Sequence, residues 1–111
     1  MKTEQPLLIT SITAPSDHTS SKNKFIGFDG NLCAANVKSL GVCNANTAIN
    51  NQMPVMVKGI ALVLSGAAIS VGAKIASDAN GKAVTYSTGE HNGFTLDSAA
   101  GADELIRVLL L

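Results

Sequence analysis

Charged side chains are scarce in this sequence. Asp, Glu, Lys and Arg make up 14% of the 111 residues, and the 8 basic and 8 acidic residues cancel to a formal net charge of zero. Soluble domains usually carry about 25% charged residues. A chain without net positive charge lacks the electrostatic attraction by which nucleic acids and anionic membranes are bound. A surface with so few charges favours binding to protein partners, against which its uncharged residues become buried.

Aromatic residues and cysteines are also few. The sequence has no Trp, and its aromatic residues are Phe25, Phe28, Tyr86 and Phe94. They are too few to form the stacking platforms that bind single-stranded nucleic acids. Cys33 and Cys43 fit neither a zinc ribbon nor a redox pair. Each stands in an apolar stretch, which favours buried free thiols and synthesis in a reducing cytosol, with a disulfide as the alternative.

Long hydrophobic runs are absent as well. Near the N-terminus only Leu7–Ile9 is continuously apolar, where a signal peptide would need about 7–15 such residues. The longest apolar stretch, residues 59–73, is shorter than the roughly 20 residues of a helical membrane span. Ser65-Gly66 interrupts it, so we predict two buried strands joined by a turn.

Turn-forming residues recur about every 8–12 residues from Lys24 onward, the spacing expected of a β-barrel or sandwich. Asp29-Gly30 and Asn80-Gly81 each separate two apolar runs and predict hairpins, the second with a two-residue type I′ turn. We expect an all-β fold, a small barrel or sandwich of short antiparallel strands. At most one short helical turn, capped by Asp97, is expected near residues 97–100.

The N-terminal residues differ from the rest of the chain. A small apolar cluster is followed by a polar, turn-rich run that contains His18. This composition predicts an N-terminal arm over residues 1–23, ahead of a β-barrel domain over residues 24–111. The apolar cluster of the arm consists of Leu7, Leu8, Ile9 and Ile12.

The C-terminal residues 104–111 predict a strand with apolar residues on both faces. One face carries Ile106, Val108 and Leu110, and the other carries Leu105, Arg107 and Leu109. Such a strand either lies centrally in its sheet or is covered by a neighbouring subunit.

No motif for catalysis, nucleotide binding or metal binding is complete. Gly81-Lys82 lacks the Ser or Thr that should follow it in a P-loop, and no Gly stands five residues before Gly81. His18 and His91 lie in polar stretches and are expected in solvent, and no cluster of metal ligands is visible. We expect neither an enzyme nor a cofactor. The alternative is a small-ligand-binding or hydrolytic barrel that pairs Cys33 or Cys43 with His91.

Glycines and small apolar residues form a recognisable pattern over residues 58–84. Its successive parts are Gly59, Ala61 and Val63; Ala68-Ile69; Gly72 and Ile75; and Asp78, Gly81, Lys82, Ala83 and Val84. This pattern resembles the core of a family of small capsid cement (decoration) proteins of tailed bacteriophages, often mislabelled as recombinase-like. Residues 93–111 are similar to the family's ending, and residues 12–17 and 27–42 resemble its N-terminal part more weakly. Residues 43–56 depart from the pattern.

The resemblance implies a β-barrel made in the host cytoplasm that binds the outer surface of an assembled phage head. Its partners would be the major capsid protein, whose subunits it bridges, and two further copies of itself in a homotrimer near threefold axes. Neither nucleic acid nor membrane is an expected partner. Leu7, Leu8, Ile9 and Ile12 are the expected capsid-contact residues, on an arm that adds a strand to a sheet edge of the capsid protein. Another virion β-domain, from a tail, fibre or baseplate, is the alternative.

Overall fold

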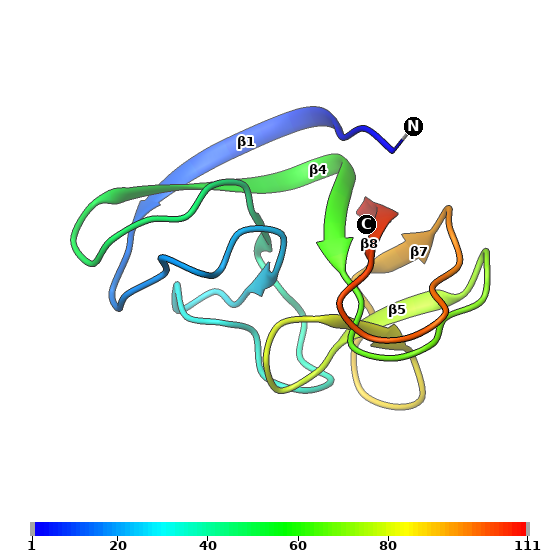
Figure 1. Cartoon of the computed structure of the whole chain (residues 1–111). Coiled ribbons are helices and arrows are strands. Elements are labelled where there is room, and N and C mark those ends of the chain that lie inside the picture. Colours follow the sequence, from blue (N-terminus) through cyan, green and yellow to red (C-terminus); the bar gives the residue numbers. More distant parts are fainter. Residues whose placement is uncertain (1, 111) are drawn as a thin grey trace.

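The structure, a computed structural model, describes residues 2–110, and none of these residues is helical. Met1 and Leu111, which begin the predicted arm and end the predicted terminal strand, lie outside the described residues. The all-β prediction is confirmed, and the strands pair antiparallel (Figure 1). The strands are β1 (Gln5–Thr13), β2 (Phe25–Ile26), β3 (Gly41–Cys43), β4 (Gln52–Leu64), β5 (Lys74–Ser77), β6 (Ala83–Thr85), β7 (Gly93–Thr95) and β8 (Leu105–Leu110).

Part of the sheet curls into a small, nearly closed barrel. The strands β4, β8, β7, β5 and β6 are hydrogen-bonded neighbours in this order. The barrel closes directly after β4, where Ser65 forms a parallel bridge with Ala83 of β6. The backbone N–H of Gly66 also donates to the carbonyl oxygen of Ala83, at 2.7 Å. Closure removes the free sheet edges that would otherwise be exposed at β4 and β6.

The terminal strand β8 lies centrally, between β4 and β7. Ile106, Val108 and Leu110 point into the barrel and are buried, whereas Leu105 and Leu109 are exposed on its outer face. The predicted alternation is therefore confirmed. The barrel cluster of buried side chains comprises Phe25, Cys33, Val42, Met56, Ala61, Val63, Ile69, Ile75, Ala83, Ala99, Ile106, Val108 and Leu110.

The short strands β2 and β3 separate the barrel cluster from a second, smaller one. Because neighbours along a strand point to opposite faces, Phe25 and Val42 join the barrel cluster while Ile26 and Cys43 join the other. The backbone of Phe25 is tied to the barrel by its N–H, which donates to Gly81 O at 2.7 Å. The second cluster comprises Ala14, Ile26, Cys43, Met53 and Val55, with Ile12, Leu32 and Leu40 packed against it.

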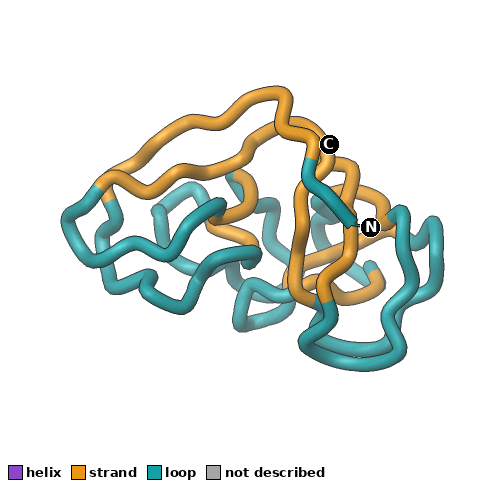
Figure 2. Tube along the Cα trace, turned by 45° about the horizontal axis from the view of Figure 1, so that its top comes forward, coloured by secondary structure: helices purple, strands orange, loops and turns teal. Residues whose placement is uncertain are grey.

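The first half of β4 leaves the barrel and pairs with β1 (Figures 1 and 2). We call this two-stranded element, β1 with residues 52–58 of β4, the ribbon. β4 changes direction where it passes from the ribbon into the barrel (Figure 1). Gly59, at which β4 begins to pair with β8, has a φ of 115°, which is unfavourable for other residues. A Cβ atom at Gly59 would lie 2.5 Å from the carbonyl oxygen of Gln5, so glycine is also needed for the close approach of β1.

One predicted element is wrong, because residues 65–73 form a loop rather than a second strand. Residues 97–100 form no helical turn either, which is within the expectation of at most one. Instead, these two segments form hydrogen bonds with each other. Ile69 and Ala99 exchange a pair of backbone hydrogen bonds, each 2.9 Å, and Ser65 Oγ donates to Gly101 O at 2.7 Å. The backbone groups that a strand or helical turn would have used are therefore already paired.

The hairpin at Asn80-Gly81 is present, but its predicted type I′ turn is wrong. A type I′ turn needs positive φ at both central residues, and only Gly81 has one, of 75°. Asp78 N donates to Lys82 O at 2.8 Å, which closes a three-residue loop. The Asp78 carboxylate fixes this geometry because it accepts hydrogen bonds from the N–H groups of Asn80 and Lys82, at 2.8 and 2.9 Å.

Candidate interaction surface

Among the large apolar side chains of residues 2–110, the most exposed one lies on the ribbon. On β1, Leu7 is 83% exposed, Leu8 54% and Ile9 42%. Ile12 differs, because it is half-buried and packs against the second cluster. The structure thus places three of the four predicted contact residues together at the surface and turns the fourth inward. A contiguous exposed apolar run is typical of an interaction site.

β1 also has an unpaired edge. It pairs with β4 from Thr13, opposite Gln52, to Gln5, opposite Ile60, with register shifts around Leu8. Within residues 2–110 no strand pairs with its other edge. Natural edge strands are usually blocked by charges, prolines or bulges. Pro6 and the register shifts disrupt the start of β1, but residues 9–13 pair regularly and carry neither charge nor proline. This segment is therefore able to accept a further strand.

The outer face of the barrel is a second apolar area. Ile60 of β4, Leu109 of β8 and Phe94 of β7 are cross-strand neighbours in one row. The row continues into Lys74 of β5, which is opposite Phe94. A cross-strand row lies on one face of a sheet. Of these side chains Leu109 is 42% exposed.

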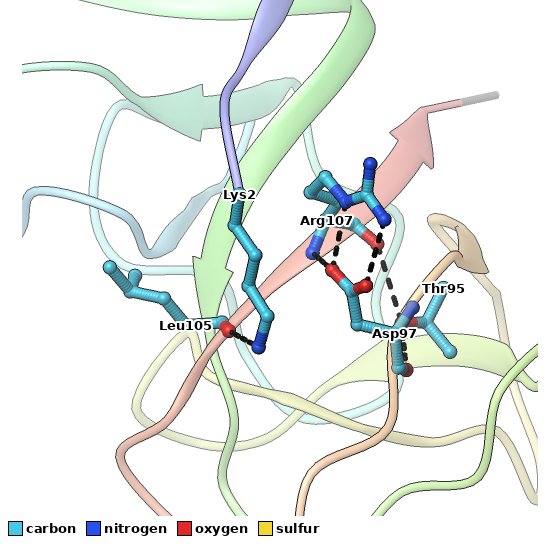
Figure 3. Close-up of polar contacts among 5 residues, drawn as sticks. All are labelled: Lys2, Thr95, Asp97, Leu105 and Arg107. Atoms are coloured by element: carbon cyan, nitrogen blue, oxygen red, sulfur yellow. Dashed lines mark hydrogen bonds and ion pairs between the residues drawn. The ribbon is translucent and has the colours of Figure 1, made fainter.

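An ion pair accompanies this row (Figure 3). Asp97 lies directly after the exposed Leu96, and its carboxylate accepts three hydrogen bonds from Arg107 of β8. They come from Nη2 at 2.9 Å, Nε at 3.0 Å and the backbone N–H at 2.9 Å. Hydrogen bonding by Arg107 lowers the pKa of Asp97 to about 2. The carboxylate of Asp97 is bonded to Arg107 and caps no helical turn.

The N-terminal segment reaches the same face. Lys2 Nζ donates to the backbone oxygen of Leu105 at 2.8 Å (Figure 3). Lys2 precedes β1, and Gln5 at the start of β1 pairs with Ile60 of the row. The exposed run of the ribbon and the outer face of the barrel therefore adjoin each other where the chain begins.

The cysteines and histidines form no reactive group. Cys33 and Cys43 are buried free thiols, as predicted, in different clusters on opposite sides of β2 and β3. Their Sγ atoms donate to Val37 O and Ala45 O, at 3.2 and 3.1 Å. Burial raises the pKa of both thiols, which disfavours the nucleophilic thiolate.

The prediction that His18 is exposed is wrong. Its side chain is 2% exposed, its Nε2 lies 2.8 Å from Gly30 O, and its Nδ1 lies 2.8 Å from Ser21 Oγ. Ser21 of the same polar run and the more distant Gly30 supply these partners, so burial leaves neither ring nitrogen unpaired. His91 is half-buried, and its ring makes edge contacts with Tyr86 and Phe94 at centroid distances of 5.8 and 5.9 Å.

Residues 2–110 enclose no pocket and hold no group of three or more His, Cys, Asp or Glu side chains arranged for a metal ion. The described part of the chain also forms no helix long and apolar enough to cross a membrane. The chemically distinctive features of this surface are therefore its apolar side chains and the free edge of β1.

Sequence reasoning missed two features of the surface. The pairing of Asp97 with Arg107 had a signal, because Arg107 is the only charged residue in an otherwise apolar terminal strand and needs a partner. The pairing of β1 with β4 had no local signal, since the two strands are joined through residues 14–51.

Two of three comparisons with known proteins found a match. A model of the phage cement protein family matches residues 5–110. None of the curated protein sequences matches the chain. The crystal structure of the N base of head fibre gp8.5 from bacteriophage phi29 has a TM-score of 0.76, with 94% of this chain and 95% of that chain covered. Because only 16% of the residues are identical, this likeness shows the fold alone.

Proposed function

Since the chain belongs to the phage cement protein family, and is thus a phage capsid-associated structural protein, we propose that it binds the outer surface of the assembled head and stabilises it without enzymatic activity. It does so by bridging neighbouring subunits of the major capsid protein. The observation that carries this proposal is the ribbon, with its exposed apolar run at Leu7–Ile9 and its unpaired edge over residues 9–13.

The ribbon binds by extending a sheet of the capsid protein. Main-chain hydrogen bonds along residues 9–13 provide affinity, while apolar pockets for Leu7 and Leu8 provide specificity. β1 is already held by β4. Less conformational entropy is therefore lost on binding than if a disordered arm had to become ordered.

Stabilisation of the head follows from mass action. A protein that binds only the assembled shell stabilises each site by RT ln(1 + [L]/Kd), about 2.7 kcal/mol at a concentration one hundred times Kd. The site must span two capsid subunits for this energy to resist their separation. Linking several binding sites in a homotrimer raises the effective affinity further without new contacts.

The apolar outer face of the barrel supports self-association into that homotrimer. Leu105 and Leu109 are exposed on β8 although they belong to a rigid central strand. Packing between copies would remove them from water. A mass measurement in solution and on the shell tests the trimer, and a monomer in both settings would contradict it.

A non-enzymatic role is supported by the buried, hydrogen-bonded thiols and by the incomplete P-loop at Gly81-Lys82. The P-loop failure also argues against recombinase activity. The alternative within the virion is a tail, fibre or baseplate domain, and locating the protein in particles distinguishes these positions.

The experiment compares heads that lack this protein with the same heads after it is added back. We expect wild-type protein to raise the temperature and the osmotic stress at which the heads release DNA. The double variant Leu7→Ser/Leu8→Ser should fold but protect much less, because both side chains are exposed in the free protein. Val71→Ser is the matched control, since Val71 is 66% exposed but lies in a loop of the barrel.

Equal stability of the heads with and without wild-type protein would overturn the proposal. Equal protection by the double variant and the wild type would show that capsid binding does not use the ribbon.

A further inference from the structure

Phe28 is an exposed aromatic side chain in a protein that has few of them. It is 72% exposed, whereas Phe25 is fully buried and Phe94 is half-buried. Exposure of one large apolar side chain alone is common on protein surfaces. The backbone that carries Phe28 distinguishes this case.

Phe28 is the first residue of a tight three-residue loop. Gly27 N donates to Asn31 O at 2.8 Å and closes the loop, and Gly30 N donates to Gly27 O at 3.0 Å. Gly30 has a φ of 87°, which is the left-handed conformation that such a loop requires. The position of Phe28 is therefore fixed by backbone hydrogen bonds on both sides.

Side chains from neighbouring segments brace the same loop. Asp29 Oδ1 accepts from Asn31 N at 3.0 Å, and Ser16 Oγ donates to Asn31 Oδ1 at 2.8 Å. The buried imidazole of His18 donates from Nε2 to Gly30 O at 2.8 Å. The loop is thus held by its own Asp29 and by Ser16 and His18 of the preceding segment, and it presents Phe28 in a fixed place.

The fold itself does not need an aromatic residue there. The loop between β5 and β6 has the same geometry, with Asp78 N donating to Lys82 O at 2.8 Å and Gly81 in the left-handed conformation. Ala79 occupies the position that corresponds to Phe28. A three-residue loop of this type therefore forms with a methyl side chain, and the phenyl ring at position 28 serves another purpose.

The loop adjoins the end of β1. A Cβ atom at Gly30 would lie 2.9 Å from Pro15 Cδ and 3.4 Å from Ile12 Cδ1. Pro15 and Ile12 stand at the end of the segment whose free edge is the proposed docking edge. The loop that carries Phe28 therefore lies next to the end of the ribbon, on the half of the molecule that is proposed to meet the capsid.

We infer that Phe28 is a preformed anchor that inserts into an apolar pocket of the capsid surface, beside the sheet edge that pairs with β1; this inference rests on the proposed function. Aromatic residues that enter pockets carry a large share of binding energy at protein interfaces. Because the loop is rigid before binding, little conformational entropy is lost when the ring becomes buried. The capsid partner is thus recognised by a pocket and a strand edge together.

The test measures binding of wild type, Phe28→Ala, Phe28→Leu and Val71→Ala to purified heads that lack this protein, by co-sedimentation over a concentration series. Phe28→Ala should bind at least about 30-fold more weakly, the effect expected of an interface hot spot. Phe28→Leu should fall between Phe28→Ala and wild type, and Val71→Ala should bind as wild type does. Melting temperature and mass in solution are measured for all four proteins.

Each outcome of the binding test supports or overturns the anchor. Failure of wild type to bind would overturn the proposed function, and the anchor with it. Binding by wild type and Phe28→Ala with equal affinity would overturn the anchor alone. A lowered melting temperature of Phe28→Ala would make the ring a structural group, and a loss of oligomer mass would assign it to a contact between copies; both results would overturn the anchor.

Discussion

The barrel and the ribbon are two halves of the molecule that differ in burial: the barrel encloses a core, whereas the side chains of β1 in the ribbon are mostly exposed. In the barrel, strands pair on both edges and every second side chain of β8 is buried. In the ribbon, β1 pairs on one edge, and all but one of its side chains are exposed. The comparison teaches that β1 is held mainly by its backbone pairing with β4 and by Ile12, which packs against the second cluster. Its other side chains and its second edge are left available to a partner.

The largest expected difference between the halves is in how much the free energy of unfolding falls when a side chain is truncated to alanine. Ile106→Ala, in the barrel cluster, should lower the free energy of unfolding by about 2–5 kcal/mol, because Ile106 is fully buried. Leu7→Ala in the ribbon should change it by less than about 0.5 kcal/mol. Chemical denaturation of both variants measures this contrast, and comparable losses would show that the ribbon is part of the core.

The junction of the halves should be sensitive to one methyl group. Gly59→Ala places a Cβ 2.5 Å from Gln5 O at a φ of 115°, which we expect to cost roughly 1–3 kcal/mol and to separate the start of β1 from β4. Hydrogen exchange should accelerate in β1 and stay slow in β8. Gly101→Ala is the control, since a Cβ there meets no atom within 4 Å; faster exchange in β8 than in β1 would contradict this account.

The smallest expected effect is the loss of barrel stability at low pH. Asp97 has a folded-state pKa of about 2 because of Arg107, below the unfolded value of about 3.9. The pair therefore stabilises the barrel fully above pH 4, and its contribution disappears as the pH falls from about 4 to 2. Asp97→Asn should remove part of this acid sensitivity in melting curves. Identical pH profiles of variant and wild type below pH 4 would exclude the role of the pair.

Much of the barrel could be predicted from the sequence, because its elements are local patterns. Alternation in the C-terminal residues predicted both faces of β8, and Asn80-Gly81 marked a hairpin. The turn type was missed because it depends on the Asp78 carboxylate, whose hydrogen bonds to Asn80 and Lys82 favour a three-residue loop. The prediction of a strand after Ser65 was wrong because Ile69 of this segment pairs with Ala99, which lies far along the chain.

The surface was less predictable than the barrel. Leu7, Leu8 and Ile9 were expected to be a contact segment, but their apolar character did not reveal the pairing of β1 with β4. The burial of His18 depends on Gly30, a partner twelve residues away. Phe28 stands in an apolar run with Phe25 and Ile26, so its local sequence does not distinguish an exposed tip from a buried strand.

Cryo-electron microscopy of the decorated head tests most directly the claim that the ribbon binds the capsid. The account predicts that residues 9–13 of β1 form main-chain hydrogen bonds with a strand of the major capsid protein, with Leu7 and Leu8 buried against it. A decorated head in which the free edge of β1 faces solvent, with the protein attached through another surface, would contradict the account.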